Sequence, residues 1–121
     1  MLWNLSGDRP IYLQLMEQLK YQILSGKYQL GDHIPSVRDL AAEAAVNPNT
    51  MQKALAALEQ EGLLVNGRTT GRTVTTDESM ILNMRRDLAA TVLSDFQHSL
   101  NRLGFSEEEI REFIRNEYQL N

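Results

Sequence analysis

No cysteine occurs among the 121 residues, so neither disulfides nor thiolate metal sites can contribute to this protein. A signal peptide and a long apolar run are also missing, which predicts a soluble protein without a membrane partner; the lack of cysteine fits a reducing cytoplasm. The sequence has no Gly-rich phosphate loop, no HExxH motif and no opposed pair of carboxylates in a plausible cleft. We therefore expect no enzyme, no catalytic residue and no cofactor.

Positive charge is scarce as well, because 12 basic residues stand against 16 acidic ones and leave a net charge of −4. At first sight this balance argues against nucleic acid as a partner. However, residues 1–75 hold seven basic and seven acidic residues, so the whole acidic excess lies in residues 76–121. In the first part, Arg38, Lys53, Arg68 and Arg72 are free to face one side. So few basic residues give a weak electrostatic field, which predicts that the DNA affinity of a monomer depends only weakly on salt concentration. Sequence-specific binding would then require two copies.

Residues 34–64 predict two short helices joined by a tight turn. Ser36 can cap the first helix through its hydroxyl, and Asp39 three positions later can reach back as in a capping box. Asn47 and Pro48 repeat the signal for the second helix, since proline suits the first helical position. The turn between the helices is then only residues 44–46.

The second helix has an apolar and a polar face. Helical spacing puts Met51, Ala54, Leu55 and Leu58 on the apolar face and Asn49, Gln52, Lys53 and Ala56 on the opposite one. Asparagine and glutamine can pair with adenine in the major groove, lysine can reach guanine or a phosphate, and a helix start favours anions. This is the composition of a recognition helix, although any solvated helix face can carry the same residue types.

A β-hairpin is predicted after the helix pair. Gly62 ends the second helix, residues 63–65 form a short strand, residues 66–71 supply a turn, and residues 72–76 alternate as a second strand. Such a wing would hold Arg68, Thr70 and Gly71 beside a narrow groove, where arginine is favoured by the negative potential. Alone it could be an ordinary polar hairpin, but with the helix pair it indicates a winged helix-turn-helix.

Specific residues at fixed positions strengthen this interpretation between residues 10 and 74. They are Gly26, Gly31, Asp32, Ile34, Pro35, Ser36, Arg38, Leu40, Ala41, Asn47, Asn49, Thr50, Ala54, Leu55, Leu58, Gly62, Leu63 and Gly71. The segment resembles the DNA-binding domain of the GntR family of bacterial transcription regulators. Its opening Pro10, Ile11, Tyr12 and Gln14 and its short tail are similar to the YtrA-type subfamily. That resemblance implies a dimeric repressor, often of operons encoding ABC transporters.

The resemblance, taken with the polar helix face, places the DNA contacts at the two helix starts and in the wing. The residues expected to make them are Ser36, Arg38, Asn47, Asn49, Thr50, Gln52, Lys53, Arg68, Thr70 and Gly71. Two positions depart from the family's pattern. Gln52 stands where many relatives have arginine, which leaves the base preference open. Ala45 stands where a turn glycine is usual, and alanine costs about 1 kcal/mol if the position requires a positive φ.

The residues before the helix pair predict a helix and a short strand. The helix covers residues 10–25, with Asp8 as a plausible cap and Gly26 at its end. Trp3 is expected to pack against this helix or a dimer partner. Residues 27–34 would form a turn and the small third strand of a winged helix. His33 lacks ligand partners at metal-binding spacing, so a surface or strand-end role is expected.

Residues 76–121 predict an antiparallel hairpin of two helices separated by Gly104. Thr76 or Asp77 can cap the first helix, and Ser106 with Glu109 makes a capping box for the second. The second helix is expected to bury Ile110, Phe113 and Ile114. His98 with the scattered carboxylates Asp87 and Asp95 does not make a metal site, so no bound metal is expected.

Apolar residues cover too much of this hairpin for one small domain to bury. The leftover face is expected to meet a second copy across a two-fold axis. The residues assigned to that contact are Ile81, Met84, Leu88, Val92, Phe96 and Phe113. The competing interpretation is an effector pocket, for which two helices leave little room.

The sequence thus predicts a mainly α protein with a small β wing (α+β), a winged helix-turn-helix followed by a C-terminal antiparallel helical hairpin. Residues 1–75 would bind DNA and residues 76–121 would form the dimer. The predicted function is a transcription regulator, a homodimeric repressor of its own operon that binds a palindromic operator in double-stranded DNA. The alternative is a protein-interaction or scaffold module, which predicts an apolar recognition-helix face. The sequence does not identify the operator, the regulated genes or any small-molecule effector. It also does not distinguish a repressor from an activator.

Overall fold

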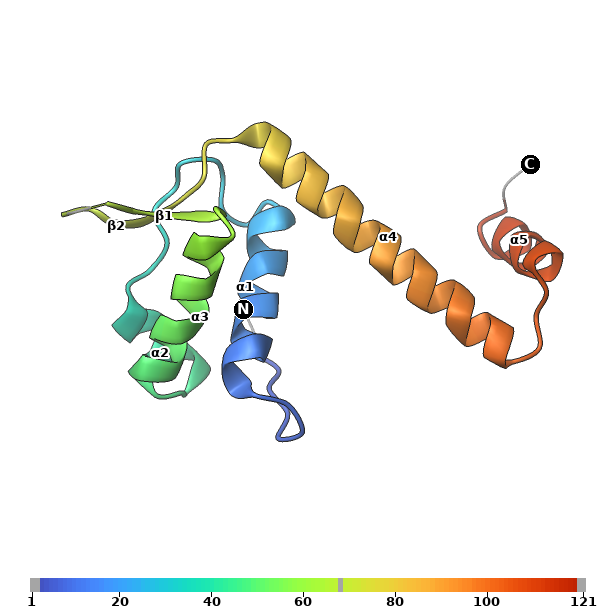
Figure 1. Ribbon diagram of the computed structural model, residues 1–121, viewed down its shortest axis with the longest axis horizontal. Helices are drawn as coiled ribbons and strands as arrows, with labels where there is room; N and C mark the ends of the chain where they lie inside the picture. Colours follow the sequence, from blue (N-terminus) through green and yellow to red (C-terminus); the bar gives the residue numbers. More distant parts are fainter. Residues whose placement is uncertain (1–2, 68, 120–121) are drawn as a thin grey trace. The chain divides into compact units, whose positions relative to one another are not determined.

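The computed structural model describes residues 3–67 and 69–119, which form five helices and one two-stranded antiparallel sheet (Figure 1). The elements are α1 (Ile11–Leu24), α2 (Val37–Ala44), α3 (Pro48–Gln60), β1 (Leu64–Gly67), β2 (Gly71–Val74), α4 (Glu78–Arg102) and α5 (Glu107–Glu117). This order confirms the predicted fold class, a winged helix-turn-helix followed by a helical C-terminal region. The chain divides into two compact units, Met1–Leu82 and Asn83–Asn121.

α1 supplies much of the core of the first unit. Leu15, Leu19 and Ile23 recur at helical spacing and are at most 3% exposed. The helix lies side by side with α3 and packs against it (Figure 1). The prediction that Asp8 caps α1 is wrong. Pro10 is the N-cap residue and makes no side-chain cap bond, so Asp8 lies too far before the first turn to reach its N–H groups and instead accepts a hydrogen bond from the Ser6 hydroxyl.

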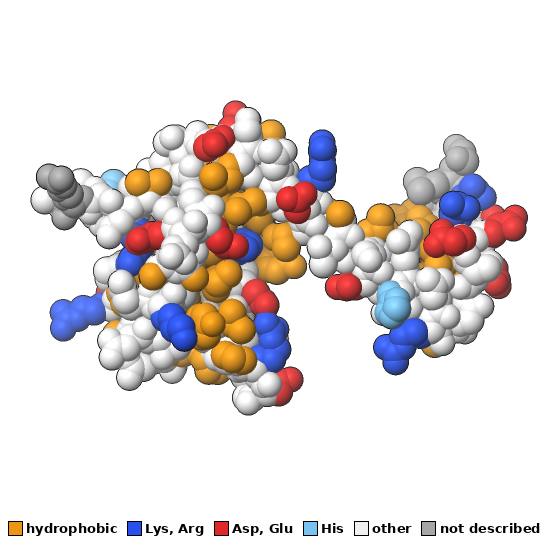
Figure 2. Space-filling view, viewed as in Figure 1, with side chains coloured by type: hydrophobic (Ala, Val, Ile, Leu, Met, Phe, Trp, Pro, Cys, Tyr) orange, Lys and Arg blue, Asp and Glu red, His pale blue; other side chains and the backbone are white. Residues whose placement is uncertain are grey.

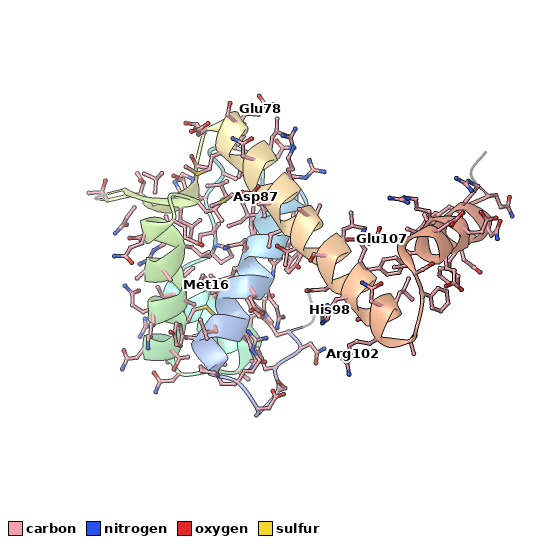
Figure 3. All side chains as sticks on the ribbon, turned by 45° about the vertical axis from the view of Figure 1, so that its right-hand side comes forward. Met16, Glu78, Asp87, His98, Arg102 and Glu107 are labelled. Carbon is pink, nitrogen blue, oxygen red and sulfur yellow. The ribbon has the colours of Figure 1, made fainter. Side chains whose placement is uncertain are left out.

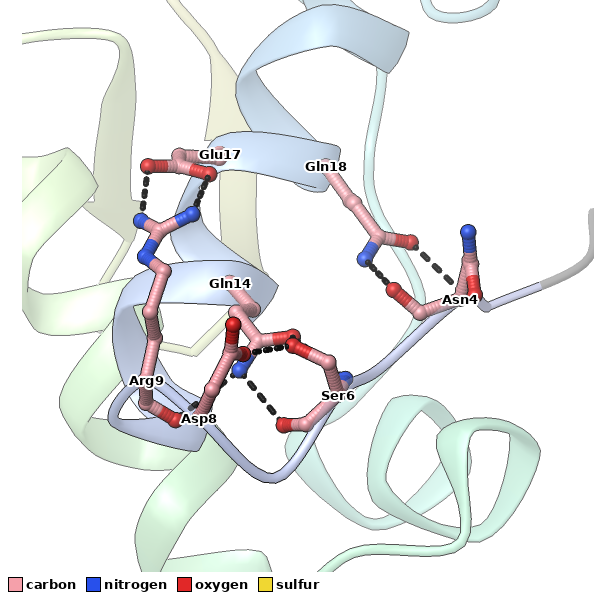
Figure 4. Close-up of polar contacts among 7 residues, drawn as sticks. All are labelled: Asn4, Ser6, Asp8, Arg9, Gln14, Glu17 and Gln18. Atoms are coloured by element: carbon pink, nitrogen blue, oxygen red, sulfur yellow. Dashed lines mark hydrogen bonds and ion pairs between the residues drawn. The ribbon is translucent and has the colours of Figure 1, made fainter.

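Two glutamines of α1 hold the N-terminal segment against the helix (Figure 4). Gln14 Oε1 accepts the backbone N–H of Ser6 at 2.7 Å, and its Nε2 donates to the carbonyls of Ser6 at 2.8 Å and Arg9 at 2.9 Å. Gln18 bonds the backbone of Asn4 in the same way, accepting at 3.2 Å and donating at 2.8 Å. Gln14 is buried, and these bonds satisfy both ends of its amide.

The turn between α2 and α3 covers residues 45–47, one residue later than predicted. Ser36 Oγ accepts the N–H of Asp39 at 3.1 Å and Asn47 Oδ1 accepts the N–H of Asn49 at 2.7 Å, so both caps are present. Among the described hydrogen bonds, the reciprocal one from the Ser36 N–H to the Asp39 carboxylate does not occur, so the capping box is half formed. Ala45 ends α2 in the left-handed conformation, with φ 57° and ψ 46°.

The wing is a tighter hairpin than predicted. Antiparallel pairing runs from Leu64 opposite Val74 to Gly67 opposite Gly71, so residues 66, 67 and 71 belong to strands. Of the predicted turn, the described residues Thr69 and Thr70 remain in a turn. The third strand is a single bridge between His33 and Thr73, flanked by a bond from the Val74 N–H to the Asp32 carbonyl at 2.8 Å. The strand-end role of His33 is confirmed.

The second unit buries few side chains. Among its described residues only Leu100 and Ile110 fall in the buried class, at 9% and 2% exposed. The Ser106 capping box forms fully, with both bonds to Glu109 at 3.1 Å, and the rings of Phe105 and Phe113 meet edge to face at 5.8 Å. The prediction that Phe113 and Ile114 are buried is wrong for a single chain, because two helices alone cover too little surface. None of the described helices could span a membrane.

Replacing Ala45 with glycine should stabilise the protein. The left-handed backbone costs alanine about 1 to 2 kcal/mol, and glycine removes this cost. Glycine also makes the unfolded chain more flexible, which offsets part of the stabilisation. We expect Ala45→Gly to raise the free energy of unfolding by about 0.5 to 1 kcal/mol, measured by urea denaturation. Ala42→Gly, at an exposed helical position of α2, is the matched control and should lower it by about 1 kcal/mol. Destabilisation by both would contradict the strain at Ala45.

Candidate nucleic-acid interface

The apolar face of α3 is buried completely. Met51, Ala54, Leu55 and Leu58 are each 0% exposed, and the helix packs against both α1 and α2. Asn49, Gln52 and Lys53 are consequently exposed on the other side, and Thr50 is half-buried. The structure therefore turns outward the polar edge that the sequence predicts, at the start of the helix, where unpaired N–H groups favour anions.

The two capping residues keep hydrogen-bond donors available. The cap bonds use the oxygens of Ser36 and Asn47 as acceptors. Their remaining groups, a hydroxyl and an amide NH₂, can still donate. Donors beside helix starts suit the oxygens of a phosphate, so a structural role and a DNA contact are compatible at both positions.

Arg38 lies in the first turn of α2 and is exposed. Within residues 3–67 and 69–119 it has no hydrogen-bond or ion-pair partner, in contrast to Arg9, which pairs with Glu17, and Lys20, which pairs with Glu61 at 2.8 Å. A free guanidinium at the start of α2 can contact a phosphate bidentately.

Lys53 is held more closely than sequence reasoning predicts. Its ammonium lies over the ring of Tyr12, 3.8 Å from the centroid, which is a cation–π contact between α3 and α1. Tyr12 belongs to the opening of the chain, 41 residues before Lys53, so no local pattern in the sequence indicated this contact. The contact fixes the position of a cation on the exposed edge of α3.

Arg72 is not free to face DNA, and that expectation is wrong. Its Nε donates to Glu59 of α3 in an ion pair whose side chains are only 12% and 26% exposed. Its Nη1 donates to Gln52 Oε1 at 3.4 Å. The register of β2 brings this side chain within reach of α3, where Glu59 follows Gln52 by two turns on one helix face. Sequence reasoning missed Glu59, because helical spacing places it on the face of Gln52 but does not show which strand residue lies opposite that face.

The tip of the wing presents a hydroxyl and an unhindered backbone. Thr70 and Gly71 are exposed, and Gly71 has a φ of 78°, a conformation that favours glycine. Arg68, the third residue assigned to the wing contact, lies outside the described residues.

Charges of both signs are interspersed over the visible face of the first unit (Figure 2). Besides the acidic partners above, Glu43 of α2 acts on Tyr28, whose pKa is raised mainly by burial of the ring and further by this carboxylate. Such a surface has a weak field, so contacts with DNA depend on the placement of single side chains.

The described residues contain no group of three or more His, Cys, Asp or Glu side chains that could hold a metal ion. Asp87 and His98 occupy separate points along α4 (Figure 3).

The fold and the exposed edge of α3 define the class, a winged helix-turn-helix DNA-binding protein. Residues 11–74 match the family described as bacterial regulatory proteins, gntR family. YhcF of Bacillus subtilis, named an uncharacterized HTH-type transcriptional regulator, is 32% identical over 109 residues, 90% of each chain. The transcriptional repressor YtrA of the same organism is 45% identical over 58 residues, which cover 48% of this chain and 45% of YtrA.

Solved structures agree with the sequence match. A GntR family transcriptional regulator from Listeria monocytogenes superposes with a TM-score of 0.85 at 32% identity, over 93% of this chain and 98% of that one. The DNA-binding domain of AraR in complex with operator ORE1 gives a TM-score of 0.54 at 27% identity, over 62% of this chain and 94% of AraR's domain. The chain belongs to the GntR family, and its resemblance to YtrA is confirmed. It is a DNA-binding transcription regulator, a class of protein without enzymatic activity.

Asn47→Ala should lower the free energy of unfolding by about 1 kcal/mol, because the N–H of Asn49 loses its cap. Asn47→Asp is the matched control, since an aspartate retains the accepting oxygen and suits the positive end of the helix. We expect urea denaturation to show a loss for alanine and little change for aspartate. Equal losses would mean that the cap bond contributes nothing to stability.

Proposed function

We propose that this protein is a homodimeric repressor that binds a palindromic operator in double-stranded DNA. The observation that carries the proposal is the exposed polar edge of α3, formed by Asn49, Gln52 and Lys53 above a fully buried apolar face. Repression is supported by the similarity of the DNA-binding segment to YtrA, which is named a repressor. The proposed target is the operon that contains this protein's own gene. The YtrA-type resemblance favours an operon that encodes an ABC transporter.

Each part of the first unit has a role in this proposal. Arg38 and the donors of Ser36 and Asn47 contact phosphates and fix the orientation of the domain. The residues that read base edges in the major groove are Asn49, Thr50, Gln52 and Lys53. The wing, through Arg68, Thr70 and Gly71, enters the adjacent minor groove. Bound in this way, the protein would block access of polymerase to the promoter.

The proposed dimer uses the apolar side chains that a single chain leaves uncovered. Val92, Phe96 and Phe113 are 55%, 37% and 38% exposed, while Ile81, Met84 and Leu88 are half-buried. Burying apolar surface contributes about 25 cal/mol per Å², so contact with a second copy would be favourable. In the proposed division of labour, residues 76–121 hold two copies of residues 1–75 about 34 Å apart, the spacing of successive major grooves.

Arg38→Ala should weaken operator binding by about 1 to 3 kcal/mol, because the exposed guanidinium that contacts a phosphate is removed. The melting temperature should not fall, since Arg38 has no partner among the described residues. Titration of labelled operator at several salt concentrations measures the affinity and its salt dependence, which should become shallower. Arg111→Ala removes the same charge from α5 and should leave binding unchanged. Unaltered binding by the Arg38 variant would reject the proposed position of α2 on DNA.

Leu88→Glu should convert the dimer into monomers that bind the operator poorly, because a carboxylate cannot be buried unpaired at the contact. Size-exclusion chromatography with light scattering measures the mass, and circular dichroism verifies that the helices remain. Ala90→Glu, on the other side of α4 and exposed, is the control and should stay dimeric. A dimer that survives the Leu88 change would place the interface elsewhere.

One selection experiment tests the proposed function directly. Fragments of the source genome that the full chain retains would reveal the operator and the neighbouring genes. A palindromic site upstream of the protein's own operon supports an autoregulatory repressor. A chain that is not retained on any duplex at low salt would instead favour the scaffold alternative.

A further inference from the structure

We propose that Arg72 is a positioning residue that sets the base preference of the recognition helix through Gln52. The inference rests on the proposed contact of Gln52 with a base edge. It goes further because it assigns a role to a wing residue that does not itself touch DNA.

Arg72 bridges the wing and α3. One nitrogen of its guanidinium, Nε, donates to Glu59 and another, Nη1, donates to Gln52 Oε1 at 3.4 Å. The Arg72 side chain is only 12% exposed, and its charge faces the Glu59 carboxylate. A guanidinium used in this way is poorly placed to contact a phosphate, whereas Gln52 remains exposed on the outer edge of the helix.

The chemistry of arginine decides how the Gln52 amide is oriented. A guanidinium carries donors only, so the atom of Gln52 that faces Arg72 must be the accepting oxygen. The amide NH₂ of Gln52 is then the group left for the groove, and it can only donate. Guanine presents two acceptors at its major-groove edge, N7 and O6, whereas adenine pairs well with a glutamine that offers both an acceptor and a donor. Gln52 held by Arg72 should therefore prefer guanine over adenine.

Glu59 restrains the side chain of Arg72 and so keeps the Gln52 amide in this orientation. Without a carboxylate partner, the long arginine side chain would sample many rotamers and would hold Gln52 weakly. The ion pair anchors Nε, which leaves Nη1 at a fixed place beside Gln52. Hence Glu59, Arg72 and Gln52 act as one unit, and loss of any member should alter the same base preference.

The test compares the full-length wild type with Q52A, R72A and R72K on operators that carry each base at every position. We expect wild type to prefer guanine over adenine about fivefold or more at one position per half-site, and Q52A to lose that preference. R72A should lose the guanine preference at the same position. The double variant Q52A/R72A should lose no more of this preference than either single variant. R72K retains a charge for Glu59 but offers one ammonium in place of two separate donors, so it should fold like wild type and still lose the preference.

Three results would overturn the inference. If R72A keeps the preference that Q52A loses, Arg72 does not position Gln52, although the base contact of Gln52 stands. If the salt dependence of R72A becomes shallower by about one counterion, Arg72 is itself a phosphate contact. If Q52A changes no position, the proposed base contact of Gln52 and this inference both fall. Melting temperatures of all variants separate these results from unfolding.

Discussion

Burial of the apolar face of α3 is the constraint on which the structure of the first unit depends. Met51, Ala54, Leu55 and Leu58 are completely covered, and the helix is held by α1 on one side and α2 on the other. Rotating an α-helix by one residue turns each side chain through about 100°, which would move Lys53 toward the core. Core packing therefore determines which side chains can meet DNA, although none of the four core residues touches it.

Positive charge is used sparingly in this protein. Glu17, Glu59 and Glu61 neutralise Arg9, Arg72 and Lys20, and Lys53 lies over an aromatic ring. Strong nonspecific attraction to DNA needs many unpaired cations on one face. Because the described residues of the first unit have few, the affinity of the protein for DNA must come largely from well-placed polar contacts. The same acidic residues fix the basic side chains in defined positions, which favours selective over nonspecific binding.

The second unit is incomplete as a folded body by itself. α4 and α5 bury only Leu100 and Ile110 among their described residues, and large apolar side chains such as Val92 and Leu103 remain more than half exposed. An isolated pair of helices rarely buries enough surface to be stable. The proposed association of two chains would cover this apolar surface and would bring two DNA-binding domains to one operator.

The sequence by itself determined the features that depend on short separations. The caps at Ser36, Asn47 and Ser106 and the faces of α3 all follow from residues within one or two helical turns. Only the tertiary structure decided that Arg72 pairs with Glu59, that Lys53 meets Tyr12 and that Phe113 stays uncovered in one chain. These outcomes depend on how whole elements dock, because helical and strand periodicity indicates which face is apolar but not which side chain lies opposite.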